Sequence, residues 1–482
     1  MVKTFYEQES MHDEYMVNEY SHHKFDDDNI LVTVETGAWV VLDRQEYDLL
    51  RLGKVEEDQE LFKKLKEKGI ILTEDNVDEV AKEYRKSKKQ LTQGPSLHII
   101  TPTLRCNAKC VYCHSRAKPE AEEEYDMDEE TAERTVDFIM EGPNDSIIIE
   151  FQGGELTLNW DITEHIIDYA KEKADEKGKD VQFSLVTNLT TMNEDIIESL
   201  KERDIMGLST SLDGPREIHD HNRPYFGGGG THEDVVHWIE RIKTEFENDF
   251  NLNALTTVTK PALDHGPEIV DEFTELGFTG VWLRPLNNIG YAADTWEQIG
   301  YTMEEFYDFW NETLDYIMKK NRQGVEFTEL MSMVFLKKIL QAEDPMMVDI
   351  MSPCGAGISQ LLYKYNGDIH TCDEGKINDE FRLGNVEESD WTDIIGNETV
   401  ISMMDASSME GYLSKNSPWE PYVGVCPIYT LESQGTIISK LPEDDKWNLY
   451  TDITKEIFRR IIFNENDREI FFDWYKTDRV FD

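Results

Sequence analysis

The chain has 482 residues, of which 39% are hydrophobic, so it is long enough for several domains with sizeable cores. Its 48 Lys and Arg residues are outnumbered by 99 Asp and Glu residues, which gives a formal net charge of −51. This charge argues against binding to the backbone of DNA or RNA and against docking on anionic membranes, because both need basic surfaces. The acidic residues are spread along the chain, which is typical of an acidic cytosolic protein, or of a salt-rich cytoplasm where ions screen the repulsion.

The segment MVKTFYEQESMHDEYM at the start of the sequence lacks the apolar stretch and the small residues of a signal peptide. No run of about 18 apolar residues follows it. We therefore expect a soluble, cytoplasmic protein without membrane contact. Because the cytosol keeps thiols reduced, the six cysteines are expected to be ligands or catalytic groups rather than disulfides.

Residues 1–92 are predicted to form a small α+β unit of the winged-helix type. The stretch NILVTVETGAWVVLD predicts a hairpin that turns at Thr36 and Gly37. Two runs with helical spacing follow, RQEYDLLRL and DQELFKKLKEKG, and IILT is then a short strand. The polar stretch VDEVAKEYRKSKKQLTQG predicts a helix and a linker that ends near Gly94.

Residues 96–300 alternate between strand-like and helical runs. The strand-like runs cover residues 97–104, 146–153, 181–188, 207–214, 251–260 and 280–288. Repeated βα units predict a parallel sheet, and six units predict an open (βα)6 partial TIM barrel rather than a closed barrel of eight. In such folds the chemistry takes place at the C-terminal ends of the strands.

The remaining part of the chain changes character twice. Residues 301–350 are predicted to be a helical linker. Within residues 351–440, QLLYKYNGDIHTCDEG predicts a hairpin that turns at Asn366 and Gly367. Residues 441–482 are predicted to form a closing amphipathic helix.

Three cysteines, Cys106, Cys110 and Cys113, lie in the stretch LRCNAKCVYCHS, where the first strand-like run ends. The spacing C-x3-C-x2-C on one loop favours joint ligation of an iron–sulfur cluster over disulfides, whose geometry it does not suit. A [4Fe–4S] cluster held by three thiolates leaves one iron open to an exogenous chelator. The alternative is a zinc site that uses the adjacent His114 and a more distant ligand.

This motif, with an aromatic residue before its last cysteine, resembles the signature of the radical S-adenosylmethionine (SAM) superfamily. The resemblance implies that the cluster binds SAM and cleaves it reductively to a 5′-deoxyadenosyl radical, which removes hydrogen from a substrate. It also implies that SAM is contacted by residues that match family positions, namely Tyr112, Gly153, Gly154, Glu155, Asn188, Ser211 and Arg223. Taken singly, these residues could equally form a turn, a solvated acid or an ordinary ion pair.

The other three cysteines are Cys354, Cys372 and Cys426. The pattern C-x12-G-x4-C, formed by Cys354, Gly367 and Cys372, resembles the start of the SPASM/twitch segment. This segment carries auxiliary clusters in radical SAM peptide modifiers. Because the cysteine-rich middle of a full SPASM motif is absent, the resemblance implies one auxiliary [4Fe–4S] cluster with three thiolates. Its fourth site is either open to substrate or filled by a nearby side chain, and the alternative is a hairpin with buried structural cysteines.

Asp373 adjoins Cys372 and matches the position of the general base in sulfatase maturases. A carboxylate beside a cluster is a reasonable proton acceptor. The alternative is a surface acid in a turn.

The stretches CGAGISQLLYKYNGDIHTCDEG and CPIYTLESQG resemble the His-Xaa-Ser-system radical SAM maturases, and the N-terminal unit resembles PqqD-like peptide-recognition domains. These resemblances imply a precursor peptide or protein substrate and an electron donor such as ferredoxin or flavodoxin. Two other functions remain open. One is a sulfatase-maturase-like formylglycine-generating enzyme, against which the shortened auxiliary motif counts, and the other is a non-catalytic, metal-stabilised peptide-binding protein.

Overall fold

The structure is a computed structural model that describes residues 15–246, 251–341, 345, 347–408 and 417–476. A ten-stranded sheet forms its centre, in the order β14-β13-β12-β11-β10-β9-β6-β15-β16-β17. In chain order its strands are β6 (Leu97–Ile100), β9 (Ser146–Phe151), β10 (Asp180–Val186), β11 (Gly207–Ser211), β12 (Leu252–Thr257), β13 (Gly280–Arg284), β14 (Thr328–Glu329), β15 (Gln360–Tyr363), β16 (Asp368–His370) and β17 (Arg382–Asn385). The predicted α/β fold with a large, mostly parallel sheet is therefore confirmed.

Six strands of this sheet follow one another in sequence order. Each of β6, β9, β10, β11, β12 and β13 is parallel to the next. The helices between and after them are α6 (Glu129–Met140), α7 (Trp160–Lys177), α8 (Glu194–Glu202), α9 (Arg216–Asn222), α10 (His232–Glu245), α11 (Gly266–Glu275), α12 (Tyr291–Ile299) and α13 (Met303–Arg322). The first and the last of these helices begin with side-chain caps: Asp128 accepts a hydrogen bond from the N–H of Thr131 at α6, and Thr302 and Glu305 form a capping box at α13.

The sheet extends beyond these six strands at both edges. At one edge β14 pairs in parallel with β13. At the other, β15 pairs in parallel with β6, with Tyr363 opposite Ile100, and the hairpin β15–β16 turns at Gly367 with a φ of 80°. The predicted hairpin is present, but it belongs to the central sheet and does not stand apart from it. The stretch predicted as a helical linker also contains β14 in addition to α13 and α14 (Leu330–Gln341).

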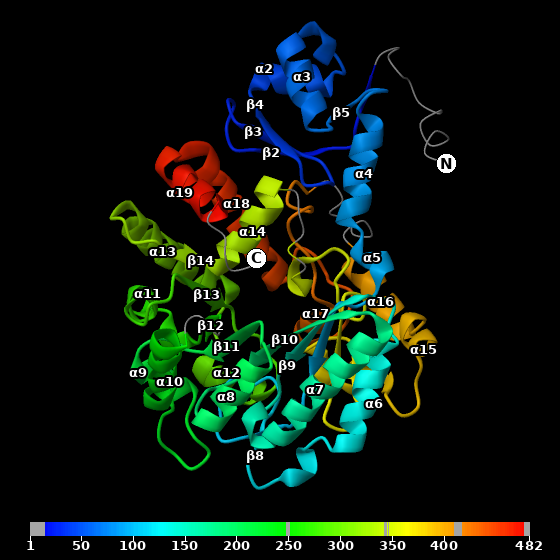
Figure 1. Cartoon of the computed structure of the whole chain (residues 1–482). Helices are drawn as coiled ribbons and strands as arrows, with labels where there is room; N and C mark the ends of the chain where they lie inside the picture. The colour runs from blue at the N-terminus through cyan, green and yellow to red at the C-terminus, as the bar shows by residue number, and fades with distance from the viewer. Residues whose placement is uncertain (1–14, 247–250, 342–344, 346, 409–416, 477–482) are drawn as a thin grey trace.

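The N-terminal unit has its own sheet and its own core (Figure 1, blue). Its antiparallel sheet consists of β2 (Ser21–Lys24), β3 (Ile30–Thr33) and β4 (Trp39–Leu42), and β1 (Met16–Val17) pairs with β5 (Ile71–Leu72). The helices are α2 (Arg44–Arg51) and α3 (Gln59–Glu67), followed by α4 (Val77–Ser87) and α5 (Gln90–Gln93). The hairpin predicted at Gly37 is β3–β4. Strand β2, with the sequence SHHK, was not predicted because it has no apolar alternation.

Hydrogen bonds attach this N-terminal unit to the C-terminal part of the chain. The indole N–H of Trp39 donates to the carbonyl of Ile339 in α14 at 2.7 Å, and the hydroxyl of Tyr422 donates to the carbonyl of Gly37 at 2.9 Å. Trp39 also packs edge-on against Phe458 of α18 (Asp445–Phe463), with ring centroids 5.3 Å apart. The unit is thus seated on helices α14 and α18 (Figure 1).

The C-terminal region contains α15 (Trp391–Ile395), α16 (Glu398–Ser407), α17 (Pro427–Gln434), α18 and α19 (Glu465–Lys476). The prediction of a single closing helix was wrong in this respect, because the chain breaks at Asn464, whose backbone is extended. The Asn464 side chain accepts a hydrogen bond from the N–H of Asp467 and so caps the start of α19. The described residues contain no helix that is both long and apolar enough to cross a membrane.

Acid sensitivity is expected from His98, which lies buried in β6 with its Nδ1 2.9 Å from the hydroxyl of Tyr363. Burial lowers the pKa of His98 from 6.5 to about 3. Between these values the unfolded chain binds a proton that the folded chain does not, so stability falls as the pH decreases, by up to ~1.4 kcal/mol per pH unit. The variant His98→Gln should therefore lose less stability between pH 7 and 4 in urea unfolding.

A second buried histidine and an exposed control histidine bear on the acid dependence of stability in His98→Gln. Burial also lowers the pKa of His370, to about 4, so part of the acid sensitivity should persist in the variant. The exposed His221 provides the matched control, and His221→Gln should follow the parent protein. An unchanged acid slope in His98→Gln would contradict the expectation.

Candidate functional site

The first cysteine group lies on the loop that follows β6, at the C-terminal end of that strand. Cys106 and Cys110 are buried, Cys113 is partly exposed, and all six cysteines of the chain are free thiols. Burial raises the pKa of Cys106 well above its usual value, and the charge of Cys110 raises it further. Burial likewise raises the pKa of Cys110 to about 11. Thiols that disfavour one another's ionisation share one small site, and a bound cationic centre would stabilise them as thiolates.

Two glycines allow the loop after β9 to lie directly against this cysteine loop. A Cβ atom on Gly154 would stand 2.1 Å from the carbonyl oxygen of Arg105, and one on Gly153, whose φ is +148°, would stand 2.4 Å from that of Thr103. The N–H of Gly154 donates to Thr103, and the N–H of Glu155 donates to Arg105. Close backbone contact therefore accounts for both glycines.

Glu155 is fully buried and holds two loops together. Its carboxylate accepts hydrogen bonds from the N–H of Asn188 and the hydroxyl of Thr187, both at 2.7 Å, and from the hydroxyl of Thr157 at 2.8 Å. Burial raises the pKa of Glu155, and these hydrogen bonds counteract that shift. The Asn188 side chain in turn lies 3.6 Å from the sulfur of Cys106. Of the predicted SAM-contacting residues, Asn188 therefore lies at the cysteine loop, and Glu155 holds Asn188 in place.

A polar network connects Tyr112 of the cysteine loop to the segment that follows β11. Nη1 of Arg223 donates to the hydroxyl of Tyr112 at 2.8 Å, and that hydroxyl donates to Oδ2 of Asp213 at 2.6 Å. Burial alone would lower the pKa of Arg223, but the negative charges of Cys110, Tyr112 and Asp213 outweigh it and raise this pKa. A fully charged guanidinium therefore stands beside the cysteines, where it can attract a carboxylate ligand.

Sequence reasoning missed Asp213. The sequence feature that could have indicated Asp213 is its position in SLDG, two residues after Ser211, at the C-terminal end of a parallel strand. Ser211 itself ends β11 and is partly exposed. Its predicted contact with SAM stays a prediction, as do those of the other matched residues.

The second cysteine group comes together from three segments. Cys354 precedes β15, Cys372 follows β16 and Cys426 caps α17. All three are buried. Burial raises the pKa of Cys372 well above its usual value, with the charge of Cys354 the next cause, and the thiol of Cys426 donates to Oε2 of Glu374 at 3.5 Å. Three thiols and a carboxylate thus share one interior site.

An ion pair connects the two cysteine groups. Nε2 of His114, next to Cys113, lies 3.0 Å from Oδ2 of Asp373, next to Cys372. Nζ of Lys376 lies 2.5 Å from the other oxygen of Asp373. Burial alone would raise the pKa of Asp373, but His114 and Lys376 outweigh it and hold the pKa far below its usual range. Asp373 is therefore a weak base. His114, the alternative zinc ligand, already contacts this carboxylate.

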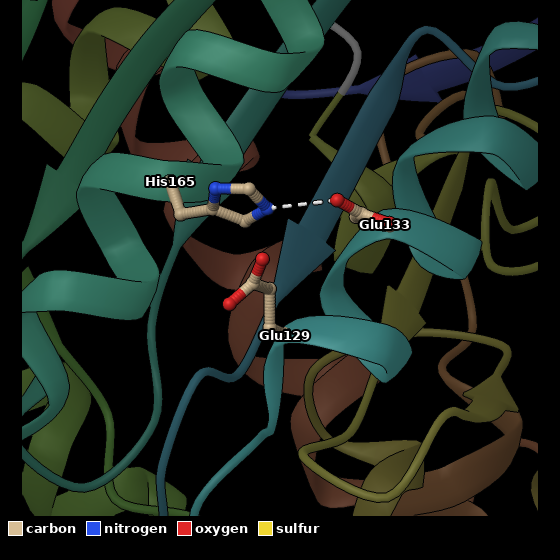
Figure 2. A group of neighbouring side chains, drawn as sticks. All are labelled: Glu129, Glu133 and His165. Carbon is tan, nitrogen blue, oxygen red and sulfur yellow. Dashed lines mark ion pairs between the residues drawn. The ribbon is translucent and has the colours of Figure 1, made fainter.

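A further group of possible metal ligands lies on the outer helices. His165 of α7 faces Glu129 and Glu133 of α6, with Nε2 of His165 3.3 Å from Oε1 of Glu133 (Figure 2). Glu129 is exposed, and the group contains no cysteine. It joins α6 to α7 as a surface ion pair and lacks the thiolates that iron–sulfur chemistry needs.

The chemistry of the first donor set fits a [4Fe–4S] cluster with SAM. Three thiols converge on one loop, an amide N–H of Asn188 points at one sulfur, and the charge of Arg223 lies beside another. Amide hydrogen bonds to cluster sulfurs and nearby positive charge both stabilise a bound cluster.

Comparison with known sequences agrees with this donor set. The sequence pattern of the radical SAM superfamily matches residues 100–260. An uncharacterised protein of Methanocaldococcus jannaschii is 33% identical over 191 residues, which cover 40% of this chain and 63%, less than two thirds, of that protein. The cysteine-type anaerobic sulfatase-maturating enzyme of Clostridium novyi is 25% identical over 332 residues, or 68% of this chain and 86% of the enzyme.

Solved structures share the fold. The enzyme anSMEcpe with bound AdoMet, which is SAM, superposes with a TM-score of 0.62 at 20% identity, over 78% of this chain and 99% of that one. SuiB of Streptococcus suis, bound to its precursor peptide SuiA, superposes with a TM-score of 0.50 at 15% identity, over 88% of this chain and 98% of that one. With three clustered thiols on the loop after the first strand of this fold, the chain is a radical SAM enzyme that resembles the anaerobic sulfatase-maturating enzymes.

Proposed function

We propose that this enzyme modifies a side chain of a ribosomally made precursor peptide or protein, as a maturase of the His-Xaa-Ser type. The observation that carries the proposal is the second cysteine group. Cys354, Cys372 and Cys426 are far apart in the sequence, yet they meet in one buried site that the ion pair of Asp373 and His114 ties to the first group. An enzyme that only cleaved SAM would not need this second site.

In the proposed reaction the cysteine loop holds the cofactors. Cys106, Cys110 and Cys113 ligate a [4Fe–4S] cluster, which together with SAM supplies the 5′-deoxyadenosyl radical when both are bound. Arg223 offers its guanidinium to the SAM carboxylate, and Asn188 orients the loop through its contact with Cys106. An electron donor such as ferredoxin or flavodoxin would supply the electron that this chemistry needs.

The second cysteine group fits an auxiliary cluster. Its three thiols are buried among apolar and charged side chains, away from bulk water. Burial raises the pKa of Cys426, and the charge of Glu374 adds to it, so these thiols resist ionisation until a cationic centre binds. The contact between Asp373 and His114 keeps the second cysteine group close to the first one.

The N-terminal unit is proposed to recognise the peptide. Its three-stranded sheet has β2 at one edge, and extended peptides bind by adding a strand to such an edge. SuiB, which is solved with its precursor peptide, shares the fold of this chain. The N-terminal unit packs on α14 and α18, which fixes its position on the rest of the chain.

Deletion of residues 1–92 tests this role. We expect the truncated chain to lose its affinity for the precursor peptide, because the sheet edge is gone, and to retain SAM-dependent release of 5′-deoxyadenosine, because the cysteine loop is intact. Peptide binding is measured by fluorescence anisotropy and deoxyadenosine by chromatography. Unchanged peptide affinity would contradict the recognition role, and the retained deoxyadenosine distinguishes lost binding from lost folding.

The substrate can be sought first in the neighbouring genes. A small open reading frame with His-Xaa-Ser repeats beside the gene of this enzyme would supply the candidate peptide. Incubation of that peptide with the reconstituted enzyme, SAM and a reductant should change its mass. An unchanged peptide, under conditions where deoxyadenosine is formed, would count against this substrate class.

A second candidate function is the formation of formylglycine, which the similarity to the Clostridium novyi enzyme over 68% of this chain favours. The small number of cysteines counts against it, since the chain has six in all and three are in the first loop. The two functions differ in product. A sulfatase-derived peptide would gain an aldehyde at its cysteine or serine, which a hydrazide reagent detects.

A further inference from the structure

We propose that Glu374 is the fourth ligand of the auxiliary cluster, so that this cluster is held by three thiolates and one carboxylate. The inference rests on the proposed function, which supplies the cluster at Cys354, Cys372 and Cys426. With Glu374, all four ligands of the cluster come from the protein itself. The carboxylate is then the ligand that an incoming substrate could displace.

The position of Glu374 is the first argument. It follows Cys372 by two residues and caps the short 3-10 helix Gly375–Ile377, whose first N–H donates to the sulfur of Cys372 at 3.4 Å. Its Oε2 lies 3.5 Å from the sulfur of Cys426. The negative charge of Glu374 also raises the pKa of each of the three thiols, Cys354 included. The carboxylate therefore contacts Cys426 and lies near enough to the other two thiols to act on their ionisation.

The hydrogen bonds of Glu374 are the second argument. Its Oε1 accepts from the side-chain amide of Asn287, on the loop after β13, at 2.5 Å. This bond fixes the carboxylate and leaves Oε2 directed at Cys426. Within the described residues Glu374 forms no ion pair. The cation whose charge acts on this site, Lys446, is paired with Asp349, so in the described part of the chain the carboxylate and the three thiols lack a cationic partner of their own. Such a set is stabilised when a cationic centre binds.

The neighbouring carboxylates are already engaged. Asp349 has an oxygen within 4.8 Å of ligand atoms of Glu374 and Cys426, but it forms a buried ion pair with Lys446, Nζ to Oδ2 at 3.2 Å. Asp373 is held by His114 and Lys376. Glu374 is thus the carboxylate at this site that forms no ion pair within the described residues, and its Oε2 already contacts a cysteine sulfur.

A carboxylate oxygen makes one iron of the cluster different from the other three. Oxygen is a harder donor than thiolate, and a non-thiolate ligand raises the reduction potential of a cluster. Replacement by cysteine should restore four thiolates and lower the potential. Replacement by glutamine removes the anionic ligand while keeping the size of the side chain.

The experiment isolates the auxiliary cluster in a chain that carries Cys106→Ala, Cys110→Ala and Cys113→Ala together. After anaerobic reconstitution with ⁵⁷Fe, Mössbauer spectra should resolve one distinct iron in four. Adding Glu374→Gln should remove that distinct iron, and adding Glu374→Cys should keep the cluster with a lower midpoint potential. The surface variant Glu380→Gln is the matched control and should leave the spectrum unchanged, because Glu380 is exposed.

The outcomes separate this inference from the proposed function. A triple-alanine chain that binds no iron would overturn the auxiliary cluster itself and, with it, the role of Glu374. A bound cluster whose spectrum and potential do not respond to Glu374→Gln and Glu374→Cys would overturn the ligand alone. Loss of the distinct iron in Asp349→Asn, with Glu374→Gln unchanged, would assign the fourth site to Asp349.

Discussion

Replacement of Cys110 by alanine is expected to abolish the release of 5′-deoxyadenosine and to remove about four iron atoms per chain. Cys110 is buried, and the charges of Arg223 and Cys113 both act on its thiol. Its loss leaves two thiolates, too few for a stable cluster with an open iron. Iron and sulfide are measured after anaerobic reconstitution, and deoxyadenosine after incubation with SAM and dithionite.

Cys354→Ala is the matched control for this prediction. Cys354 is also a buried cysteine, but it belongs to the second group. We expect it to remove the auxiliary iron and to leave deoxyadenosine release in place. Deoxyadenosine formed by Cys110→Ala at the rate of the parent protein would contradict the assignment of the loop, and zinc in place of iron would revive the zinc alternative.

The second large effect is expected on stability, from the replacement of Lys446 by methionine. Lys446 and Asp349 form an ion pair that is almost entirely buried, with 4% and 11% of their side chains exposed. Burial alone would raise the pKa of Asp349, but Lys446 and Arg284 outweigh it and hold the carboxyl ionised. Without Lys446 a charge remains buried beside the second cysteine group, which should cost about 3–5 kcal/mol of the free energy of unfolding.

Urea unfolding followed by tryptophan fluorescence measures this cost. Lys440→Met, at an exposed lysine, is the control and should change the free energy of unfolding by less than about 0.5 kcal/mol. Combining Lys446→Met with Asp349→Asn removes both charges and should recover much of the loss. If the double variant is no more stable than Lys446→Met, the ion pair is not the source of the effect.

The antiparallel hairpin β15–β16 explains why two cysteines of the second group are neighbours. Cys354 precedes β15, and because β16 runs back along β15, Cys372 follows β16 at the same end of the hairpin. The contact between His114 and Asp373 then connects this group to the loop that follows β6. The second group is thereby built into the barrel sheet and not into a separate lobe.

Local patterns were sufficient for much of the fold. The alternation of strand-like and helical runs predicted β6 to β13 because each strand and each helix carries its own apolar periodicity. The turns at Gly37 and Gly367 were readable because a positive φ favours glycine there. Strands β2 and β14 were not predicted. Strand β2 is polar, and β14 is only two residues long and depends on its neighbour in the sheet.

The sequence alone predicted the ligands of the first site and indicated the class of chemistry, because thiolate spacing on one loop is a local property. The tertiary structure decided what depends on contacts between distant segments: the meeting of Cys426 with Cys354 and Cys372, and the placing of Glu374 against them. The folded chain also determines which acids are paired with cations, since Asp373 lies against His114 and Asp349 against Lys446. The burial of a side chain and its pairing with a distant residue are properties of the folded chain, so the spacing of residues in the sequence does not predict them.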